Sequence, residues 1–114
     1  MRKDADGAAG LALGALGDPV RRQVVMLLGS TPLRAGQLAE ATGLSAPAMS
    51  KHLKVLLRAG VVTDERTEAD ARVRLFRLRP QSIAAVRAWL DQLQAHWNAQ
   101  LASFQRHVEE RSRE

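Results

Sequence analysis

The first third of the chain carries apolar residues at the three- and four-residue spacing of amphipathic helices. They line residues 8–16, although two glycines weaken that segment, and they recur more regularly over residues 20–28. Asp18 and Pro19 are a common N-cap and first helical residue, and Gly29 is a residue at which helices often end. The pattern predicts one helix over each of these two ranges.

Two more helices are predicted downstream, joined by a tight turn. Residues 35–42 place apolar side chains on one face and end at Gly43, although Arg34 is a poor N-cap. Ser45 is a good N-cap for the next helix, which is predicted to end at Gly60. The apolar stripe of that helix follows positions i, i+4 and i+7, and consists of Met49, Leu53 and Leu56.

After Gly60 the apolar pattern changes from a helical period to an alternating one. Residues 61–63 and 73–78 are rich in β-branched and alternating apolar residues, and they flank a polar segment at 65–71. This arrangement predicts a β-hairpin. Residues 31–33 carry neither pattern and are predicted to form a connector.

A long helical pattern follows Pro80 and continues for about 30 residues. A domain of this size cannot cover so long an apolar stripe with its own core, and an exposed stripe normally contacts a partner. The sequence therefore predicts a helix over residues 80–110 that joins two copies of the chain. The stripe consists of Val86, Leu90, Leu93, Trp97, Leu101, Phe104 and Val108.

The chain has 114 residues, which suffices for one domain with a single core, predicted over residues 1–114 with disorder at 1–8 and 111–114. No apolar run approaches the roughly 20 residues of a membrane span, and the N-terminus lacks a hydrophobic signal segment. These features predict a cytoplasmic protein. Cysteine is absent, which excludes disulfides, thiolate metal sites and cysteine nucleophiles. With no recognisable nucleophile–base pair, phosphate loop or carboxylate dyad, the sequence predicts no enzyme.

The basic charge is concentrated in one segment. The chain has a net charge of +5, and residues 45–79 contribute +4 of it, from eight basic and four acidic side chains. Residues 80–114 hold four basic and four acidic side chains and sum to zero. A basic segment within a small domain favours a polyanionic partner such as double-stranded DNA.

Residues 38–53 have the layout of a helix-turn-helix motif, with a short support helix, a glycine-containing turn and a second helix. The apolar face of the second helix is expected to pack on the support helix. Its polar face then fits a DNA major groove roughly 12 Å wide, and its first amides are available to a phosphate. The polar face is formed by Ser45, Ala46, Ser50, Lys51 and Lys54.

Several short motifs extend the similarity over residues 10–110. The sequence resembles ArsR/SmtB-family repressors in these segments: LGDPVRR (16–22), QLA (37–39), GLS (43–45), MSKHLKVL (49–56) and AGVV (59–62). The resemblance implies a mainly α winged helix-turn-helix fold with a β-hairpin wing. Its order is four helices, two strands and a long helix, and it dimerises through the first and last helices.

The resemblance also implies roles for individual residues in a homodimeric repressor that binds an inverted-repeat operator. His52 has an alternative, structural role, because it lies next to the apolar stripe of its helix. The expected DNA contacts are Ser45, Ala46, Ser50, Lys51, His52, Lys54, Arg58, Arg66, Arg72 and Arg74. The expected dimer contacts are Leu11, Leu13, Leu90, Leu93, Trp97, Leu101, Phe104 and Val108.

Relatives of this family often bind metals, and this sequence lacks both of their usual ligand sets. The thiolate site of the support helix corresponds to residues 33–36, which hold no ligand. The site of the last helix corresponds to Pro80, Ser82, Leu93 and His96, of which only the histidine binds metals. We therefore predict no cofactor and no response to metal.

Two alternatives stay open at this point. A metal-responsive repressor would use His96 with His107 and Glu110 of the second copy, since the two histidines lie about 16 Å apart along one helix. A winged-helix module for dimerisation or protein binding would have an uncharged recognition face, whereas Lys51, Lys54 and Arg58 lie there. The sequence names neither an effector nor an operator.

Overall fold

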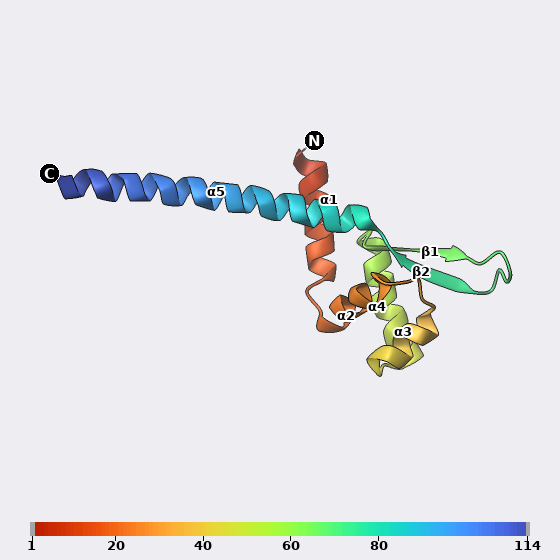
Figure 1. Ribbon diagram of the computed structural model, residues 1–114. Coiled ribbons are helices and arrows are strands. Elements are labelled where there is room, and N and C mark those ends of the chain that lie inside the picture. The colour runs from red at the N-terminus through yellow and green to blue at the C-terminus, as the bar shows by residue number, and fades with distance from the viewer. Residues whose placement is uncertain (1, 114) are drawn as a thin grey trace.

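The computed structural model describes residues 2–113 of the chain, and side chains from Gly7 to Arg113. Five helices and one two-stranded antiparallel sheet follow in the predicted order (Figure 1). The elements are α1 (Arg2–Ala15), α2 (Pro19–Leu28), α3 (Ala35–Thr42), α4 (Ala46–Arg58), β1 (Val62–Arg66), β2 (Arg74–Leu78) and α5 (Pro80–Arg113). The predicted mainly α winged-helix fold is confirmed.

Side-chain caps hold the starts of α2 and α4 where the sequence predicted them. The Asp18 carboxylate accepts hydrogen bonds from the backbone N–H of Val20 at 2.8 Å and of Arg21 at 3.1 Å. The Ser45 hydroxyl accepts one from the N–H of Ala48 at 3.3 Å. Each cap satisfies donors that a helix start otherwise leaves unpaired, which explains why both helices begin at these residues.

The turn between α3 and α4 depends on a left-handed residue. Gly43 has φ of 74°, a conformation that strains residues with a β-carbon. The N–H of Leu44 donates to the Ala39 carbonyl at 3.0 Å and closes the turn. At the start of α3, the backbone N–H of Arg34 donates to the Gln37 side chain at 2.9 Å. This contact offsets the poor capping ability that the sequence assigned to Arg34.

The hairpin is longer on its first strand than the sequence predicted. β1 runs to Arg66, two residues into the segment expected to be a turn, and Val62 pairs with Leu78 at the base of the hairpin. Two diagonal ion pairs join the strands, Arg74 to Asp64 at 2.6 Å and Arg77 to Glu65 at 2.7 Å. Cross-strand pairs of opposite charge extend strand pairing into a segment whose polarity suggested a loop.

The predicted connector at residues 31–33 also contributes to the sheet. The N–H of Leu33 donates to the Phe76 carbonyl at 3.1 Å, and the N–H of Phe76 donates to the Leu33 carbonyl at 2.8 Å. This bridge covers the outer edge of β2 and ties the hairpin to the segment between α2 and α3. Local sequence patterns do not show such a contact, because its partners are 43 residues apart.

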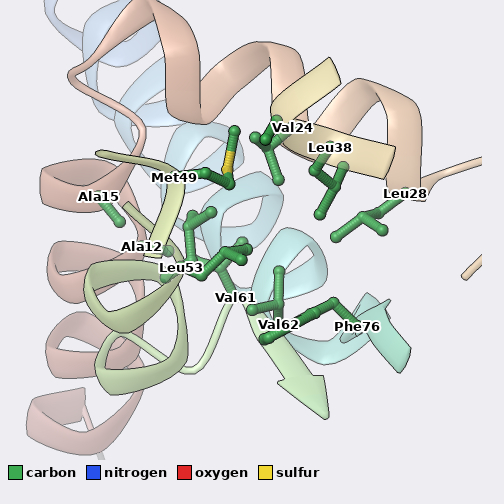
Figure 2. Close-up of a cluster of buried hydrophobic side chains, with 12 residues drawn as sticks. Ala12, Ala15, Val24, Leu28, Leu38, Met49, Leu53, Val61, Val62 and Phe76 are labelled. Carbon is green, nitrogen blue, oxygen red and sulfur yellow. The ribbon is translucent and has the colours of Figure 1, made fainter. Parts of the chain in front are cut away.

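One hydrophobic core joins α1, α2, α3, α4 and the hairpin (Figure 2). The predicted stripe of α4 is buried, with Met49 and Leu56 fully inaccessible and Leu53 at 3 % exposure. Leu38 of α3 and Val24 of α2 are also fully inaccessible, and Phe76 is buried against Val62 (Figure 2). The core therefore fixes α4 on the support helix α3, with the opposite face of α4 left at the surface.

The first and last helices include residues of the ranges 1–8 and 111–114, for which disorder stays a prediction. α1 begins at Arg2 and α5 ends at Arg113, whereas Met1 and Glu114 lie outside the described residues. α1 continues through its glycines because Ala9 and Ala12 are buried. In α5 no glycine or proline follows Pro80 to end the helix.

The outer part of α5 stands away from the rest of the molecule. α1 crosses α5 near its start, and beyond this crossing α5 projects without another element beside it (Figure 1). The molecule consequently measures 75 × 31 × 21 Å. Most of the predicted stripe is exposed on this segment, including Trp97 at 53 %, Leu101 at 65 % and Phe104 at 66 %.

Candidate nucleic-acid interface

The exposed face of α4 carries the polar residues that the sequence assigned to the DNA groove. Ala46, Ser50, Lys51 and Lys54 are exposed, and Ser45 caps the start of the helix. These positions lie opposite the buried stripe because residues three and four apart share a helix face. α4 therefore presents two cations and a helix start on one accessible surface.

Residues of α4 and the hairpin meet at a small hollow beside this face. Ser50, Lys54 and Arg74 line it together with Ala35, the first residue of α3, and its volume is about 110 Å³. The Arg74 guanidinium lies 5.0 Å from the ring centre of Phe76, on which it rests as a cation–π contact. The structure thus brings recognition-helix and wing residues together at the start of α3, where the helix dipole also favours an anion.

The hairpin arginines are compensated by neighbouring acids to different degrees. Arg74 pairs with Asp64, and Arg72 pairs with Asp70 at 3.2 Å, although the Arg72 side chain remains 92 % exposed. The N–H and guanidinium of Arg72 hold the pKa of the Asp70 carboxyl below its ordinary value. Arg66 is exposed at the end of β1. The net positive charge that faces outward from the hairpin is therefore smaller than its count of arginines suggests.

His52 is half-buried and contacts α2. Its Nδ1 lies 3.2 Å from Nη1 of Arg21, whose Nε donates to the Ala15 carbonyl at the end of α1. Because a guanidinium only donates hydrogen bonds, the His52 Nδ1 is the acceptor in this contact. The structural role that the sequence left open for His52 is thus present. It links α4 to α2 and α1.

Sequence reasoning missed Arg21 and its neighbour Asp18 as part of this polar cluster. The pKa of Asp18 is lowered, chiefly by the backbone N–H of Arg21. Desolvation, the next largest effect, opposes this shift, whereas the N–H of Val20 and the charge of Arg21 add to it. Asp18 was recognised only as a helix cap. The pattern of adjacent Arg21 and Arg22 after a cap carries no signal for a contact with a residue 31 positions away.

Arg58, another predicted DNA contact, lies at the C-terminal end of α4. It is in the last turn of α4, whereas Ser45 caps the first, and the end of α4 is turned toward α5 in Figure 1. Its neighbours there are Leu11 of α1 and Arg79 and Ser82 at the start of α5. The helical pattern placed Arg58 on the same face as Lys54, but tertiary packing brings α1 and α5 to that end of the helix.

The candidate metal ligands of the sequence are spread along α5. His96, His107 and Glu110 are all exposed on this helix, outside the core. In the described part of the chain, no group of three or more His, Cys, Asp or Glu side chains comes together as a metal site would require.

Among the helices of the described residues, none combines the length and the apolar character that a membrane span needs.

The geometry described above is that of a winged helix-turn-helix protein, with α3 and α4 as the motif and the hairpin as the wing. Residues 18–64 match the family model described as "Bacterial regulatory protein, arsR family". The chain is 40 % identical over 90 residues to the HTH-type transcriptional regulator Rv2034 of Mycobacterium tuberculosis, covering 79 % of this chain and 78 % of the relative. It is 39 % identical over 79 residues to the transcriptional repressor SmtB of the same species, covering 69 % of this chain and 56 % of that relative.

A solved structure agrees with these relatives. The crystal structure of the ArsR family transcriptional regulator RHA00566 superimposes with a TM-score of 0.70 and 28 % identity, over 80 % of this chain and 91 % of that one. The chain belongs to the arsR family of bacterial regulatory proteins. It is a DNA-binding transcriptional regulator, and the relatives named here are transcriptional regulators, a class without enzymatic activity.

Proposed function

We propose that the protein is a homodimeric repressor that binds an inverted-repeat operator through α4 and the hairpin. The observation that carries this proposal is the two-sided character of α4. Its apolar side is fixed in the core, whereas Ser50, Lys51 and Lys54 are exposed beside a hollow that a wing arginine also lines. A rigidly mounted helix with a basic polar face is what major-groove recognition requires.

The exposed stripe of α5 supports the homodimeric part of the proposal. Trp97, Leu101, Phe104 and Val108 are between 44 % and 66 % exposed and lie on one helix beyond the body of the molecule. A second copy buries such a stripe symmetrically, and a two-fold dimer presents two α4 helices to successive turns of one DNA face. The half-sites are therefore expected to lie about one helical turn apart, roughly 34–36 Å.

We propose further that the repressor does not respond to metal. Residues 33–36 hold no metal ligand, and His96 and His107 are about 16 Å apart along α5. One ion therefore cannot take both histidines of the same chain. Addition of zinc or nickel is expected to leave the DNA affinity unchanged, both in the protein and in a His107→Ala variant.

The test is a binding assay with the DNA that lies immediately upstream of the protein's own gene, followed by selection from random duplexes. We expect binding of one dimer to an inverted repeat. With about 6–10 phosphate contacts, the affinity is expected to fall roughly a thousandfold or more between 50 and 200 mM salt. Failure to bind any selected duplex would contradict the proposal and favour a protein-binding module.

A further inference from the structure

A hollow with a basic rim lies where α1, the end of α4 and the start of α5 meet. It has a volume of about 270 Å³, and its lining includes Leu11, Arg58, Gly60, Arg79 and Ser82. A second hollow of about 230 Å³ lies beside it and shares Leu11, Arg58 and Ala59 with it. We refer to the two together as the α1–α4–α5 hollow. It lies toward α5, whereas the start of α4 lies at the opposite end of that helix (Figure 1).

One side of this hollow is apolar. Leu11 and Ala15 of α1 face Val55 and Ala59 of α4. Leu11 is 60 % exposed and Val55 is 37 % exposed, so both have apolar surface that the chain itself does not cover. Gly60 lies at the edge with a φ of 73°, a conformation that favours glycine, and the space where a side chain would begin is open. This side is suited to an apolar group of modest size.

The other side carries two arginines, Arg58 and Arg79. Among the side chains described from residue 7 to 113, no carboxylate lies within ion-pair distance of either one. The hairpin arginines Arg72, Arg74 and Arg77, in contrast, are each paired with an acid. The charges of Arg58 and Arg79 are therefore available to an anion that does not belong to these described residues.

The backbones of both arginines are held in place. The N–H of Arg79 donates to the Val61 carbonyl at 2.9 Å, and the Arg79 carbonyl accepts from the N–H of Ser82 at 3.1 Å and from its buried hydroxyl at 2.8 Å. Arg58 belongs to the last turn of α4, which the core fixes. The start of α5 adds the positive end of its helix dipole. Arg58 offsets the negative dipole end at the C-terminus of α4. Two arginines with fixed backbones thus flank one apolar wall.

We propose that the α1–α4–α5 hollow binds a small organic carboxylate with an apolar tail. Arg58 and Arg79 hold the carboxylate, because guanidinium groups bind carboxylates through paired, charge-assisted hydrogen bonds. The tail lies against Leu11 and Val55. A purely inorganic anion would leave this apolar wall in water, and a neutral apolar molecule would leave the two charges unused.

Binding at this hollow has a route to the DNA-binding surface. Leu11 is also an expected dimer contact, so a ligand against it changes how the first helix meets the second copy. This regulatory consequence rests on the proposed dimeric repressor, whereas the binding itself does not. Because a ligand that prefers one dimer geometry shifts the population toward it, we expect the carboxylate to change the operator affinity.

The experiment titrates octanoate into the full-length protein without DNA, followed by calorimetry and by NMR. We expect saturable binding, with contacts from the octanoate chain to the methyl groups of Leu11 and Val55. Acetate, which has the charge without the tail, and 1-octanol, which has the tail without the charge, are each expected to bind at least tenfold more weakly. Equal binding of 1-octanol, or contacts to the exposed stripe of α5 instead, would overturn the proposal.

The variant Arg58→Gln/Arg79→Gln tests the arginines directly. Octanoate affinity is expected to fall at least tenfold, while Arg87→Gln, which removes an exposed arginine of α5 outside the hollow, leaves it unchanged. Circular dichroism verifies that both variants fold. An unchanged affinity for octanoate in the double variant would show that the site is not the one proposed.

A DNA-binding measurement separates this proposal from a role in phosphate contact. If Arg79 contacts DNA, the single variant Arg79→Gln lowers the slope of log affinity against log salt by about 0.9, and the proposal is wrong. We expect the slope to stay the same. Octanoate binding without any DNA binding would contradict the proposed repressor alone, whereas DNA binding without octanoate binding would contradict only the ligand site.

Discussion

The body of the molecule and the outer part of α5 are both helical and both rich in apolar residues, yet they use them in opposite ways. In the body, Leu38, Met49 and Leu56 are fully inaccessible within one core. Along outer α5, Leu101 and Phe104 are about two-thirds exposed. The body therefore supplies the contacts that fix its own recognition helix, whereas outer α5 needs a second molecule to bury its stripe.

The largest expected effect comes from removing the apolar character of outer α5. We expect Leu101→Asp/Phe104→Asp to abolish the homodimer, because two charges enter the stripe that the second copy covers. Operator affinity is expected to fall at least a hundredfold, since two half-sites are no longer bound together. Sedimentation measures the oligomeric state, and fluorescence anisotropy with a labelled operator measures the affinity.

This variant also tests the contrast between the two regions. The circular dichroism spectrum of the monomer is expected to stay largely helical, because the core of the body does not include Leu101 or Phe104. Gln94→Asp/Gln105→Asp, which places two charges at exposed polar positions of α5, is the matched control and is expected to remain dimeric. A dimer that survives Leu101→Asp/Phe104→Asp would contradict the role of the stripe.

A substitution in the core of the body is expected to act on stability instead. Leu56→Ala leaves a cavity beneath α4 and should lower the free energy of unfolding by about 2–5 kcal/mol. Urea unfolding, followed by circular dichroism at several protein concentrations, measures the change. For Leu101→Ala the loss is expected to depend on protein concentration, because it weakens association rather than the core. If both variants lost the same free energy of unfolding at every protein concentration, the contrast between the body and outer α5 would be contradicted.

On the DNA-facing surface, a cation without an acidic partner is expected to contribute more to operator affinity than a cation that is paired with an acid. Lys54→Gln removes an exposed charge beside the hollow that Ser50 and Arg74 line, and should lower operator affinity by about 1–3 kcal/mol and the salt slope by about 0.9. Arg77→Gln removes a half-exposed arginine that is paired with Glu65 on the hairpin. Its effect on affinity is expected to be smaller. Anisotropy titrations at several salt concentrations compare the two variants, and a larger effect of Arg77→Gln would contradict this order.

The smallest effect is expected at the cap of α2. Asp18→Ala removes the acceptor for two backbone N–H groups and should lower the melting temperature, whereas Asp18→Asn keeps a capping side chain and should lower it less. The folded-state pKa of Asp18 lies below its ordinary value of 3.8. Its charge therefore stabilises the fold above that value, and the contribution is lost as the pH falls through the lower, folded-state pKa.

Thermal melts between about pH 2 and about pH 6, a range that brackets the usual pKa values of carboxyl groups, measure this pH dependence. The wild type is expected to lose stability with falling pH more steeply than Asp18→Asn, since the amide does not titrate. Parallel curves for the two proteins would show that Asp18 makes no such contribution.

Most of the fold was predictable because its signals are local. The caps at Asp18 and Ser45, the glycine turn after α3 and the stripe of α4 each depend on residues within a few positions of one another. The boundaries that differed depend on distant partners. β1, for example, extends to Arg66 through pairing with β2.

The candidate site likewise has features that local spacing predicts and features that depend on distant partners. Helical spacing alone places Ser50, Lys51 and Lys54 on one face, and the structure leaves that face exposed. The same spacing also groups Arg58 with them, but it does not show that Arg58 lines a hollow together with residues of α1 and α5. Spacing along one helix specifies a face and not what other elements cover each end of it.

The amino-acid sequence by itself determined the order of the elements, the apolar faces that form the core, the concentration of basic charge and the absence of thiolate ligands. Tertiary structure alone decided that Arg21 holds His52, that Asp64 pairs with Arg74, and that Arg58 and Arg79 flank one hollow. The physical reason is the distance along the chain over which each kind of interaction acts. Propensity, capping and periodicity act over one or two helical turns, whereas these contacts join residues that are brought together only when the core closes.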